Sequence, residues 1–209
     1  MNKVVKFGGS SLADAGQFKK VGAIIHDDSS RRYVIPSAPG KRFPSDIKVT
    51  DMLYQCYAKA VADIDFSELL TAIKDRYQEI IDELQLDLSL DKEFEIISEN
   101  FKNKIGKCYA ASRGEYLNGI VMASYLDFEF IDAADVILFD ENENCMLDET
   151  NELLQERLKG CEYAVIPGFY GRREDGTIQT FSRGGSDVTG SLVAKAIHAD
   201  MYENWTDVS

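Results

Sequence analysis

The sequence predicts an α/β fold: a three-layer αβα sandwich with a mostly parallel sheet and a helical insertion. Short apolar runs typical of buried strands alternate with segments of helical periodicity over much of the chain, which is the pattern of βαβ units. Residues 50–126 break the alternation, because their signal is almost entirely helical. The 209 residues, 44% of them hydrophobic, can bury a sizeable core, and one domain is the default expectation.

The first part of the chain is predicted to form two strands around a helix. Residues 3–7 are apolar apart from lysines and lead into a glycine pair, and residues 32–36 form a similar run. Between them, residues 13–26 place apolar side chains on one helical face. Residues 41–48 are polar and contain a proline, so we expect a surface loop.

Residues 50–126 are predicted to form several amphipathic helices in succession. Apolar positions follow helical spacing in residues 52–61, 69–84 and 87–103. Thr50 and Asp51 suit a helix cap, and the run Ser112-Arg113-Gly114-Glu115 is expected to open the last helix of this stretch.

The last third of the chain returns to alternating strands and helices. Strands are predicted at residues 128–132, 135–139, 163–167 and 200–205, and helices at 148–158 and 186–198. Asp148 is a candidate cap for the first of these helices. A hairpin is expected after residue 168, turning at residues 174–176.

Composition argues against several classes of function. The formal charge of −13 is unsuited to a nucleic-acid surface, and no apolar stretch is long enough to cross a membrane. The N-terminal residues do not show the pattern of a signal peptide. The four cysteines lack C-x-x-C spacing, which argues against a metal centre, so no metal ligands are assigned. We expect the cysteines to be free thiols in a reducing cytoplasm.

The first chemical motif is Lys6-Phe7-Gly8-Gly9-Ser10-Ser11, where a strand carrying a lysine runs into a glycine turn. Glycine lets the backbone approach an anion closely, and lysine adds a mobile positive charge. The run is neither a Walker A loop nor G-x-G-x-x-G. An ordinary strand-to-helix turn is the alternative, but a lysine inside an apolar strand is costly to bury without a partner, which favours a functional role.

The second motif is Arg183-Gly184-Gly185-Ser186-Asp187, which precedes a predicted helix. Arginine offers a fork for a carboxylate, the glycine amides suit an oxyanion, and Asp187 could orient Mg²⁺. The alternative is purely structural: Ser186 caps the helix and Asp187 complements its dipole.

Weaker motifs lie at other predicted strand ends. They are Ser37-Ala38-Pro39-Gly40 after the second strand and Thr206-Asp207 after the last one. Each could be a simple turn. However, ligands of parallel sheets bind at the carboxyl ends of the strands, so we expect these motifs to share one site with the two glycine pairs.

Taken together, the motifs resemble the amino-acid kinase family, and within it the aspartate kinases. The resemblance extends along the whole chain and is carried, in order, by Lys6-Phe7-Gly8-Gly9-Ser10-Ser11-Leu12, Ser37-Ala38-Pro39-Gly40, Val49-Thr50-Asp51-Met52-Leu53, Ser112-Arg113-Gly114-Glu115, Pro167-Gly168-Phe169-Tyr170-Gly171, Arg183-Gly184-Gly185-Ser186-Asp187-Val188-Thr189 and Trp205-Thr206-Asp207-Val208. The helical insertion before Glu115 is also similar to that of aspartate kinases.

The resemblance implies ATP-dependent phosphorylation of the β-carboxylate of L-aspartate, with Mg²⁺, at the entry to lysine, threonine and methionine synthesis. By matching position, Lys6 and Asp187 are the implied catalytic residues, and Glu115 and Arg183 hold the ammonium and α-carboxylate of the substrate. The implied substrate-binding residues are Ser37, Thr50, Glu115, Phe169, Arg183 and Ser186. The implied ATP-binding residues are Lys6, Phe7, Gly8, Gly9, Ser10, Thr206 and Asp207.

The resemblance also bears on the extent of the domain. Residues 1–209 are expected to be the amino-terminal part of a single kinase domain, cut on its C-terminal side, without the regulatory ACT domains of aspartate kinases. The complete protein is expected to be a cytoplasmic homo-oligomer. Two alternatives stay open: another amino-acid kinase such as glutamate 5-kinase, and an inactive binding or oligomerisation fragment.

Overall fold

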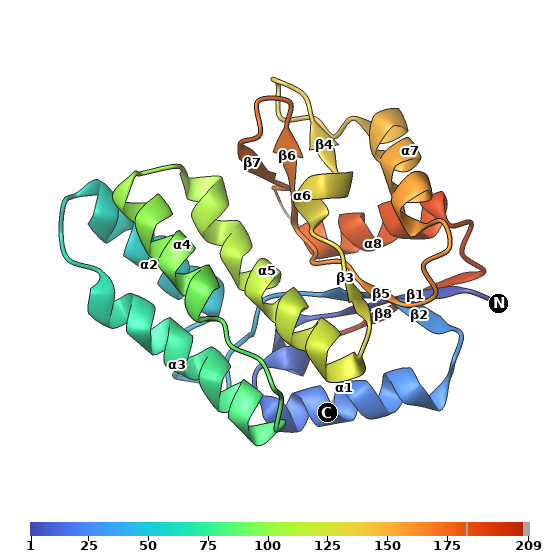
Figure 1. Ribbon diagram of the computed structural model, residues 1–209, viewed down its shortest axis with the longest axis horizontal. Coiled ribbons are helices and arrows are strands. Elements are labelled where there is room, and N and C mark those ends of the chain that lie inside the picture. The colour runs from blue at the N-terminus through green and yellow to red at the C-terminus, as the bar shows by residue number, and fades with distance from the viewer. Residues whose placement is uncertain (183, 207–209) are drawn as a thin grey trace.

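A five-stranded parallel sheet forms the centre of the molecule in the computed structural model, which describes residues 1–182 and 184–206. The strand order is β3-β5-β2-β1-β8 (Figure 1). The strands are β1 (Lys3–Phe7), β2 (Arg31–Pro36), β3 (Glu129–Phe130), β5 (Ala164–Val165) and β8 (Met201–Trp205). The predicted mostly parallel sheet is therefore confirmed.

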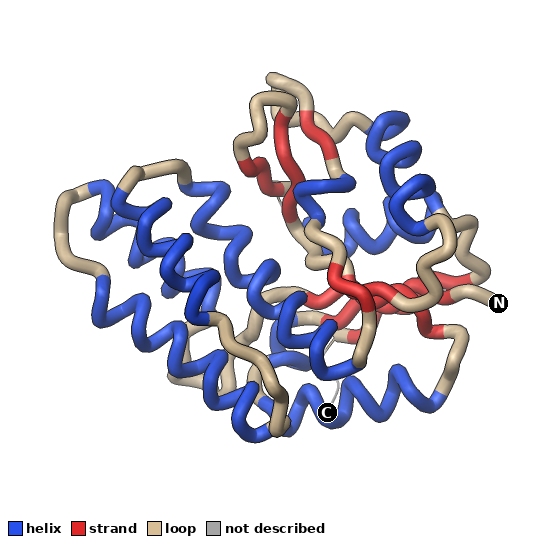
Figure 2. The backbone as a smooth tube through the Cα atoms, in the orientation of Figure 1, coloured by secondary structure: helices blue, strands red, loops and turns tan. Residues whose placement is uncertain are grey.

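Helices cover both faces of this sheet, as the predicted three-layer sandwich requires. Successive strand residues point to opposite faces, so Val5 and Val34 pack with α1 (Ala15–Asp27) and α5 (Lys107–Leu126). Val4 and Ile35 face the other way, toward α7 (Leu147–Leu158) and α8 (Gly185–Ala196). Figure 2 shows α1 on one side of the strands and α7 and α8 on the other.

The helical stretch forms a group of helices beside the sheet. It contains α2 (Val49–Val61), α3 (Ser67–Glu83), α4 (Asp91–Lys102) and α5. Figure 1 shows these helices, from cyan to yellow-green, lying together on the left of the molecule. Their buried faces share one core with α1. The helical prediction for this part of the chain is confirmed.

A second, three-stranded sheet was not predicted as a separate unit. It has the order β4-β6-β7, with β4 (Leu138–Phe139) parallel to β6 (Tyr170–Arg173) and β6 antiparallel to β7 (Ile178–Thr180). The predicted hairpin is confirmed, since Gly176, with φ of +84°, lies in the turn that joins β6 to β7. This sheet lies above α8 in Figure 1.

The helix predicted at residues 13–26 is confirmed with a small shift of its start, and two predicted helix caps are wrong. The first glycine turn leads into a 3-10 helix, η1 (Gly9–Leu12), and α1 begins later, where Asp14 accepts a hydrogen bond from the Gln17 amide at 2.9 Å. Neither Thr50 nor Asp148 is a cap, because α2 begins at Val49 and α7 at Leu147. Residues of the same types are favoured at a cap and in the first turn, and Thr50 and Asp148 lie two positions after the N-cap residues Lys48 and Met146.

The largest difference between a predicted and an observed helix start is that of α5. It begins at Lys107, so the run from Ser112 to Glu115 lies inside the helix and is buried. Gly106, with φ of +151°, precedes the true start. Most faces of α5 are buried, so no amphipathic pattern marks where it begins.

Residues 133–136, expected in part as strand, form the short helix α6 (Ala133–Val136). The Asp132 carboxylate caps this helix, because it accepts a hydrogen bond from the Ala134 amide at 2.9 Å.

In the part of the chain that the structure describes, no helix is long and apolar enough to cross a membrane. All four cysteines lie in that part and are free thiols, as predicted.

Candidate functional site

Lys6 faces α8 because it lies on the same side of β1 as Val4. Its amine is 2.9 Å from the Asp187 carboxylate in the first turn of α8. Asn204 is the β8 neighbour of Lys6 and donates to the same Asp187 oxygen at 3.0 Å. The Lys6 side chain is only 10% exposed, whereas that of Asp187 is 45% exposed. The carboxylate thus compensates a buried cation at the edge of the site.

The glycine turn after β1 crosses the turn after β2 at backbone contact. The Gly40 amide donates to the Gly9 carbonyl at 2.7 Å. A Cβ on Gly40 would lie 2.5 Å from the Gly9 carbonyl carbon, and one on Gly9 would lie 2.7 Å from the Ala38 oxygen. Both positions therefore require glycine. Gly8 donates its amide to Trp205 at 3.0 Å, so this N–H extends the pairing of β1 with β8.

The beginning of α8 meets the end of β2. The Ser37 and Ser186 hydroxyls are 3.1 Å apart. A Cβ on Gly168 would lie 2.5 Å from the Ser186 hydroxyl oxygen, so the segment after β5 also contacts this helix end directly. Gly184 precedes the helix with φ of +60°. As predicted, the second glycine pair opens a helix, whose N-terminal amides and dipole favour negative charge.

Phe169 has a left-handed backbone conformation, with φ of +84°. Such a conformation is uncommon for a bulky residue and persists only where the surroundings enforce it. The Thr189 hydroxyl accepts the Phe169 amide at 3.1 Å, and the Phe169 carbonyl accepts the Phe181 amide at 2.9 Å. A Cβ on Gly185 would lie 2.7 Å from the Phe169 ring, so Phe169 packs on the start of α8.

Glu115 supplies a buried carboxyl group from the middle of α5. The residue is 7% exposed, and its Oε2 atom has no hydrogen-bond partner among the described residues. Burial raises the pKa of Glu115 to about 8, against the opposing effect of hydrogen bonds from the backbone N–H groups of Ala38 and Glu115 and of the positive charge of Arg113. One helical turn later, Asn118 donates to the Ser37 carbonyl at 2.7 Å and ties α5 to the second turn.

Arg113 anchors α5 on its other side. Its guanidinium lies 4.6, 4.3 and 5.4 Å from the ring centroids of Tyr109, Tyr116 and Tyr170. Tyr170 belongs to β6, directly after Phe169. These cation–π contacts hold α5, which carries Glu115, at a defined position relative to the Phe169 segment.

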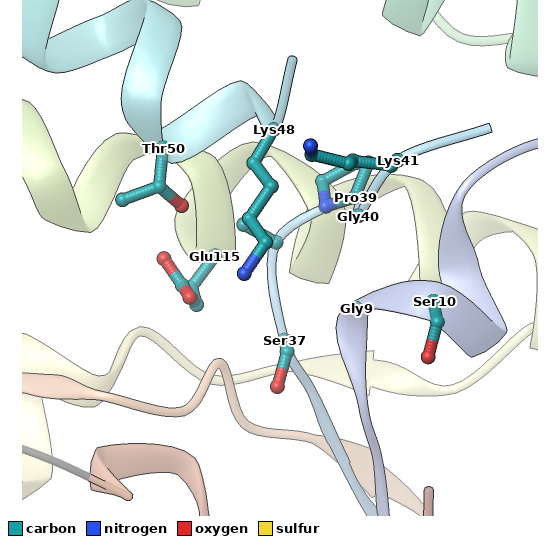
Figure 3. Close-up of a pocket in the computed structure, with 10 residues that line it drawn as sticks. Gly9, Ser10, Ser37, Pro39, Gly40, Lys41, Lys48, Thr50 and Glu115 are labelled. Carbon is teal, nitrogen blue, oxygen red and sulfur yellow. The ribbon is translucent and has the colours of Figure 1, made fainter. Parts of the chain in front are cut away.

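A cavity of about 490 Å³ lies between the two turns and the helices α2 and α5. Its lining residues come from the two turns, the following loop, α2 and α5: Gly9, Ser10, Ser37, Ala38, Pro39, Gly40, Lys41, Lys48, Thr50 and Glu115. Figure 3 shows the Glu115 carboxylate, the Thr50 hydroxyl and the Lys48 amine turned toward the same space. The cavity therefore offers an amine, a buried carboxyl group and a hydroxyl to a small polar ligand.

The site gathers most residues that the sequence analysis singled out. Gly9, Ser10, Ser37, Thr50 and Glu115 line one cavity, and two contacts connect it to α8: Lys6 with Asp187, and Ser37 with Ser186. Thr206 packs beside Gly8, Phe7 is fully buried in the core, and Phe169 lies at the start of α8. Arg183 and Asp207 fall outside the described residues.

Three residues of the site were not predicted. Lys41 and Lys48 line the cavity, and Asn118 supports Ser37. The two lysines lie in a polar segment that read as an ordinary surface loop, and Asn118 lies in a helix without a motif of its own. Only the position of Lys48 just before Val49-Thr50-Asp51 could have indicated it.

Comparison with known proteins decides the family. The whole chain, residues 1–209, matches the amino acid kinase family. The chain belongs to this family. Within it, aspartokinase 3 of Bacillus subtilis is 39% identical over 220 residues, which cover 99% of this chain and 48% of that protein. The lysine-sensitive aspartokinase 3 of Escherichia coli is 28% identical over 98% of this chain and 49% of its own length.

Solved structures of amino acid kinases share the fold. The aspartate kinase of Clostridium acetobutylicum is 52% identical, with a TM-score of 0.96, covering 99% of this chain and 48% of that one. Aspartokinase III of Escherichia coli, in complex with aspartate and ADP, has a TM-score of 0.82 at 24% identity, over 100% and 49% of the two chains, which shows a common fold. The chain thus spans about half the length of these relatives.

Within the described ranges 1–182 and 184–206, no group of three or more His, Cys, Asp or Glu side chains could hold a metal ion. Asp187 is the carboxylate beside Lys6, and it is half exposed. Mg²⁺ typically binds through one or two carboxylates together with substrate phosphates. The residues present therefore fit a magnesium ion that arrives with a nucleotide.

Proposed function

We propose that the protein phosphorylates the β-carboxylate of L-aspartate with ATP and forms 4-phospho-L-aspartate. The observation that supports this best is that a buried Glu115 oxygen, without a hydrogen-bond partner among the described residues, and the glycine turn that follows Lys6 border one small cavity. A buried acceptor group suits an ammonium, and the cationic side of the site suits carboxylate and phosphate. The similarity to aspartate kinases at 39% and 52% identity favours aspartate over glutamate.

The substrate is held by groups of complementary charge in this proposal. Glu115 accepts hydrogen bonds from its ammonium, and Thr50 lies beside Glu115 in the cavity (Figure 3). Arg183 binds the α-carboxylate, and Ser37 and Ser186 offer the substrate two hydroxyl groups that lie 3.1 Å apart. Phe169, which packs against the start of α8, borders the substrate.

The reaction needs no general base, because a β-carboxylate is already ionised at neutral pH. One of its oxygens attacks the γ-phosphorus of ATP while the bond to the leaving ADP oxygen breaks. The barrier lies in bringing two anions together in line, so positioned cations and amides supply the catalysis. We assign this role to Lys6, a buried cation beside Asp187.

The nucleotide is bound, in this proposal, by the glycine turn after β1 and the segment after β8. Lys6 through Ser10 and Thr206 with Asp207 come from these two places, and Gly8 already contacts Trp205 and Thr206. Magnesium bound to the ATP phosphates would use Asp187 as its protein ligand and neutralise charge on the phosphates. The Escherichia coli relative, which shares the fold, was solved with aspartate and ADP.

Titration calorimetry of L-aspartate into the protein, with L-glutamate as the control ligand, tests the substrate assignment. We expect selective aspartate binding that is lost in Glu115→Gln and in Arg183→Ala. Activity is measured as ATP-dependent formation of an acyl phosphate, trapped with hydroxylamine. Preference for glutamate would favour a glutamate kinase, and selective aspartate binding without turnover would favour a binding fragment.

The setting of the reaction belongs to the same proposal. We place the enzyme in the cytoplasm, in the pathway to lysine, threonine and methionine, and expect the complete protein to be a homo-oligomer. Size-exclusion chromatography with light scattering measures the oligomeric state directly. A complete protein that is a monomer at micromolar concentration would refute the proposed homo-oligomer.

A further inference from the structure

The segment of residues 41–48 connects the turn after β2 to α2 and borders the cavity at both of its ends. Lys41 and Lys48 are its first and last residues, and both line the cavity. Its base is closed by the Val49 amide, which donates to the Pro39 carbonyl at 3.3 Å. Most of the segment is exposed to solvent, so its conformation needs an anchor from elsewhere in the molecule.

Arg76 of α3 supplies that anchor. It is a buried arginine, 4% exposed, and lies far from this segment in the sequence. Its guanidinium donates to the Ile47 carbonyl at 2.6 Å and to the Gly40 carbonyl, so one side chain contacts the backbone at both ends of the segment. Five donors in a rigid plane make arginine suited to such a double contact.

Asp46 completes the anchor from within the segment. Its carboxylate is 3.2 Å from the Arg76 guanidinium and 2.9 Å from that of Arg42, and it also accepts the Arg42 amide at 2.9 Å. The Arg42 interaction lowers the pKa of Asp46. A buried cation, a shielded carboxylate and two carbonyl groups therefore form one network, whose parts are all needed to avoid leaving a buried charge unpaired.

The two lysines of the segment differ in their surroundings. Lys41 donates to the Pro44 carbonyl at 3.4 Å, so its amine contacts the segment itself. No described residue forms an ion pair or hydrogen bond with the Lys48 amine, and Figure 3 shows it turned into the cavity, on the side where Glu115 lies. The Lys48 amine therefore suits a negatively charged group of a ligand, whereas Glu115 suits a positively charged group.

We propose that Arg76 is a positioning residue that fixes the segment 41–48 at the cavity, so that Lys48 binds a carboxylate of the substrate. This proposal rests on the proposed function for its substrate, L-aspartate. The anchor itself does not depend on the ligand, because its contacts exist within the chain. Without the anchor, Lys48 would have to be ordered at each binding event, at a cost in side-chain and backbone entropy.

The test compares L-aspartate affinity by titration calorimetry in Lys48→Met, Arg76→Met and the double variant. Each single change should weaken binding about ten- to hundredfold, as for loss of one charge-assisted hydrogen bond. The double variant should bind no more weakly than Lys48→Met, because Arg76 acts through Lys48. Lys59→Met, on the exposed part of the same helix α2, is the control for net charge and should bind normally.

A second readout addresses the anchor without any ligand. Backbone amides of residues 42–47 should exchange hydrogen faster in Arg76→Met, whereas those of α1 should not change. Asp46→Asn removes the same network from the segment side and should give the same result if Arg76→Met folds poorly. Arg76→Lys, which keeps the charge but not the planar fork, should restore only part of the aspartate affinity.

The outcomes separate this proposal from the proposed function. Normal aspartate binding by Lys48→Met, or additive losses in the double variant, would overturn the role of Lys48 while leaving the aspartate assignment intact. If the unmodified protein binds no aspartate, the proposed function fails and the role of Lys48 falls with it. Unchanged exchange of residues 42–47 in both Arg76→Met and Asp46→Asn would overturn the anchor.

Discussion

Single residues set the charge pattern of this site through their burial. Glu115 and Lys6 are both buried, yet they lie in opposite electrostatic environments. Lys6 has the Asp187 carboxylate at 2.9 Å, whereas one Glu115 oxygen has no partner in the described part of the chain. An unpaired buried carboxyl group avoids ionising. Glu115 is thus prepared for a ligand that brings a positive charge.

Aspartate binding should release a proton from Glu115 near pH 7. The pKa of Glu115 is raised by burial to about 8, so the free protein holds this proton at neutral pH. A bound ammonium favours the charged carboxylate and lowers that pKa. Calorimetry in two buffers of different ionisation enthalpy measures the release, which we expect to be a large part of one proton. An equal binding enthalpy in both buffers would contradict it.

Glu115→Gln is the matched variant for this prediction. It should lose both the proton release and most of the aspartate affinity. The pKa of Glu115 is higher in the folded protein, about 8, than in the unfolded chain, about 4. The protonated carboxyl group therefore contributes to the stability of the fold at low pH, and this contribution is lost as the pH rises from about 4 toward 8. The variant should therefore lose less stability than the unmodified protein between pH 5 and pH 8, measured by urea unfolding.

Replacing Lys6 should affect turnover far more than aspartate binding. Lys6→Met removes the buried cation that we place at the transferred phosphoryl group, and loss of one such stabilising group lowers kcat by about a hundred- to a thousandfold. The KM for aspartate should change only a few fold, because in the proposed complex Glu115, and not Lys6, holds the ammonium of the substrate. Steady-state kinetics measure both, and an unchanged kcat would refute the role of Lys6.

At the scale of elements, the site depends on two turns that cross at their backbones. The turn after β1 and the turn after β2 meet at Gly9 and Gly40, where hydrogen bonding and close packing coincide. This crossing holds the lysine-bearing turn and the Ser37 turn at a constant separation. It exists only because neither position carries a Cβ.

Gly40→Ala should disrupt the crossing. The new Cβ would approach backbone atoms of Gly9 and Ser10 at 2.5–2.7 Å, and backbone cannot move aside cheaply. We expect a loss of about 1–3 kcal/mol of stability, as for other overpacked positions, together with weaker aspartate binding. Gly16→Ala, where the nearest atom is a side-chain oxygen of Asp14 at 3.1 Å, is the control. Equal behaviour of the two variants in thermal unfolding would argue against this account.

At the scale of the whole molecule, a charge network ties the last strand to the first two. Glu203 of β8 lies 2.8 Å from Lys3 of β1 and 2.8 Å from Arg31 of β2, and Trp205 donates to it at 2.9 Å. Lys3 also pairs with Asp28 at 2.9 Å. The network joins segments about two hundred residues apart in sequence and keeps β8, which supports Lys6 through Asn204, in place.

This network should make the protein sensitive to acid. Burial raises the pKa of Glu203. Hydrogen bonds from Lys3, Arg31 and Trp205 lower this pKa by more than burial raises it, so the pKa of Glu203 is lowered overall. A lowered folded pKa contributes stability above the unfolded value of about 4.3, which is lost as pH falls below it. Glu203→Gln should cost about 1–2 kcal/mol at pH 7 and flatten the acid limb in pH-dependent thermal unfolding. An acid limb of unchanged steepness would contradict this.

Sequence patterns were most reliable where one physical signal dominated. The run from Lys3 to Phe7 and the amphipathic helices of the insertion are confirmed, because strand and helix periodicity are local properties. The start of α5 and the separate sheet of β4, β6 and β7 were not predicted. The reason is that α5 is buried on most sides and that sheet membership depends on distant partners.

The sequence by itself determined the alternation of strands and helices, the two glycine turns, and the family, because backbone requirements and motif order are written along the chain. Tertiary structure alone decided that Glu115 is buried inside a helix, with an oxygen that no described residue contacts by a hydrogen bond, that Lys6 pairs with Asp187, and that Arg76 holds the segment bearing Lys48. These features depend on burial and on contacts between residues far apart in the chain. No local pattern encodes such contacts, so they appear only when the layers pack together.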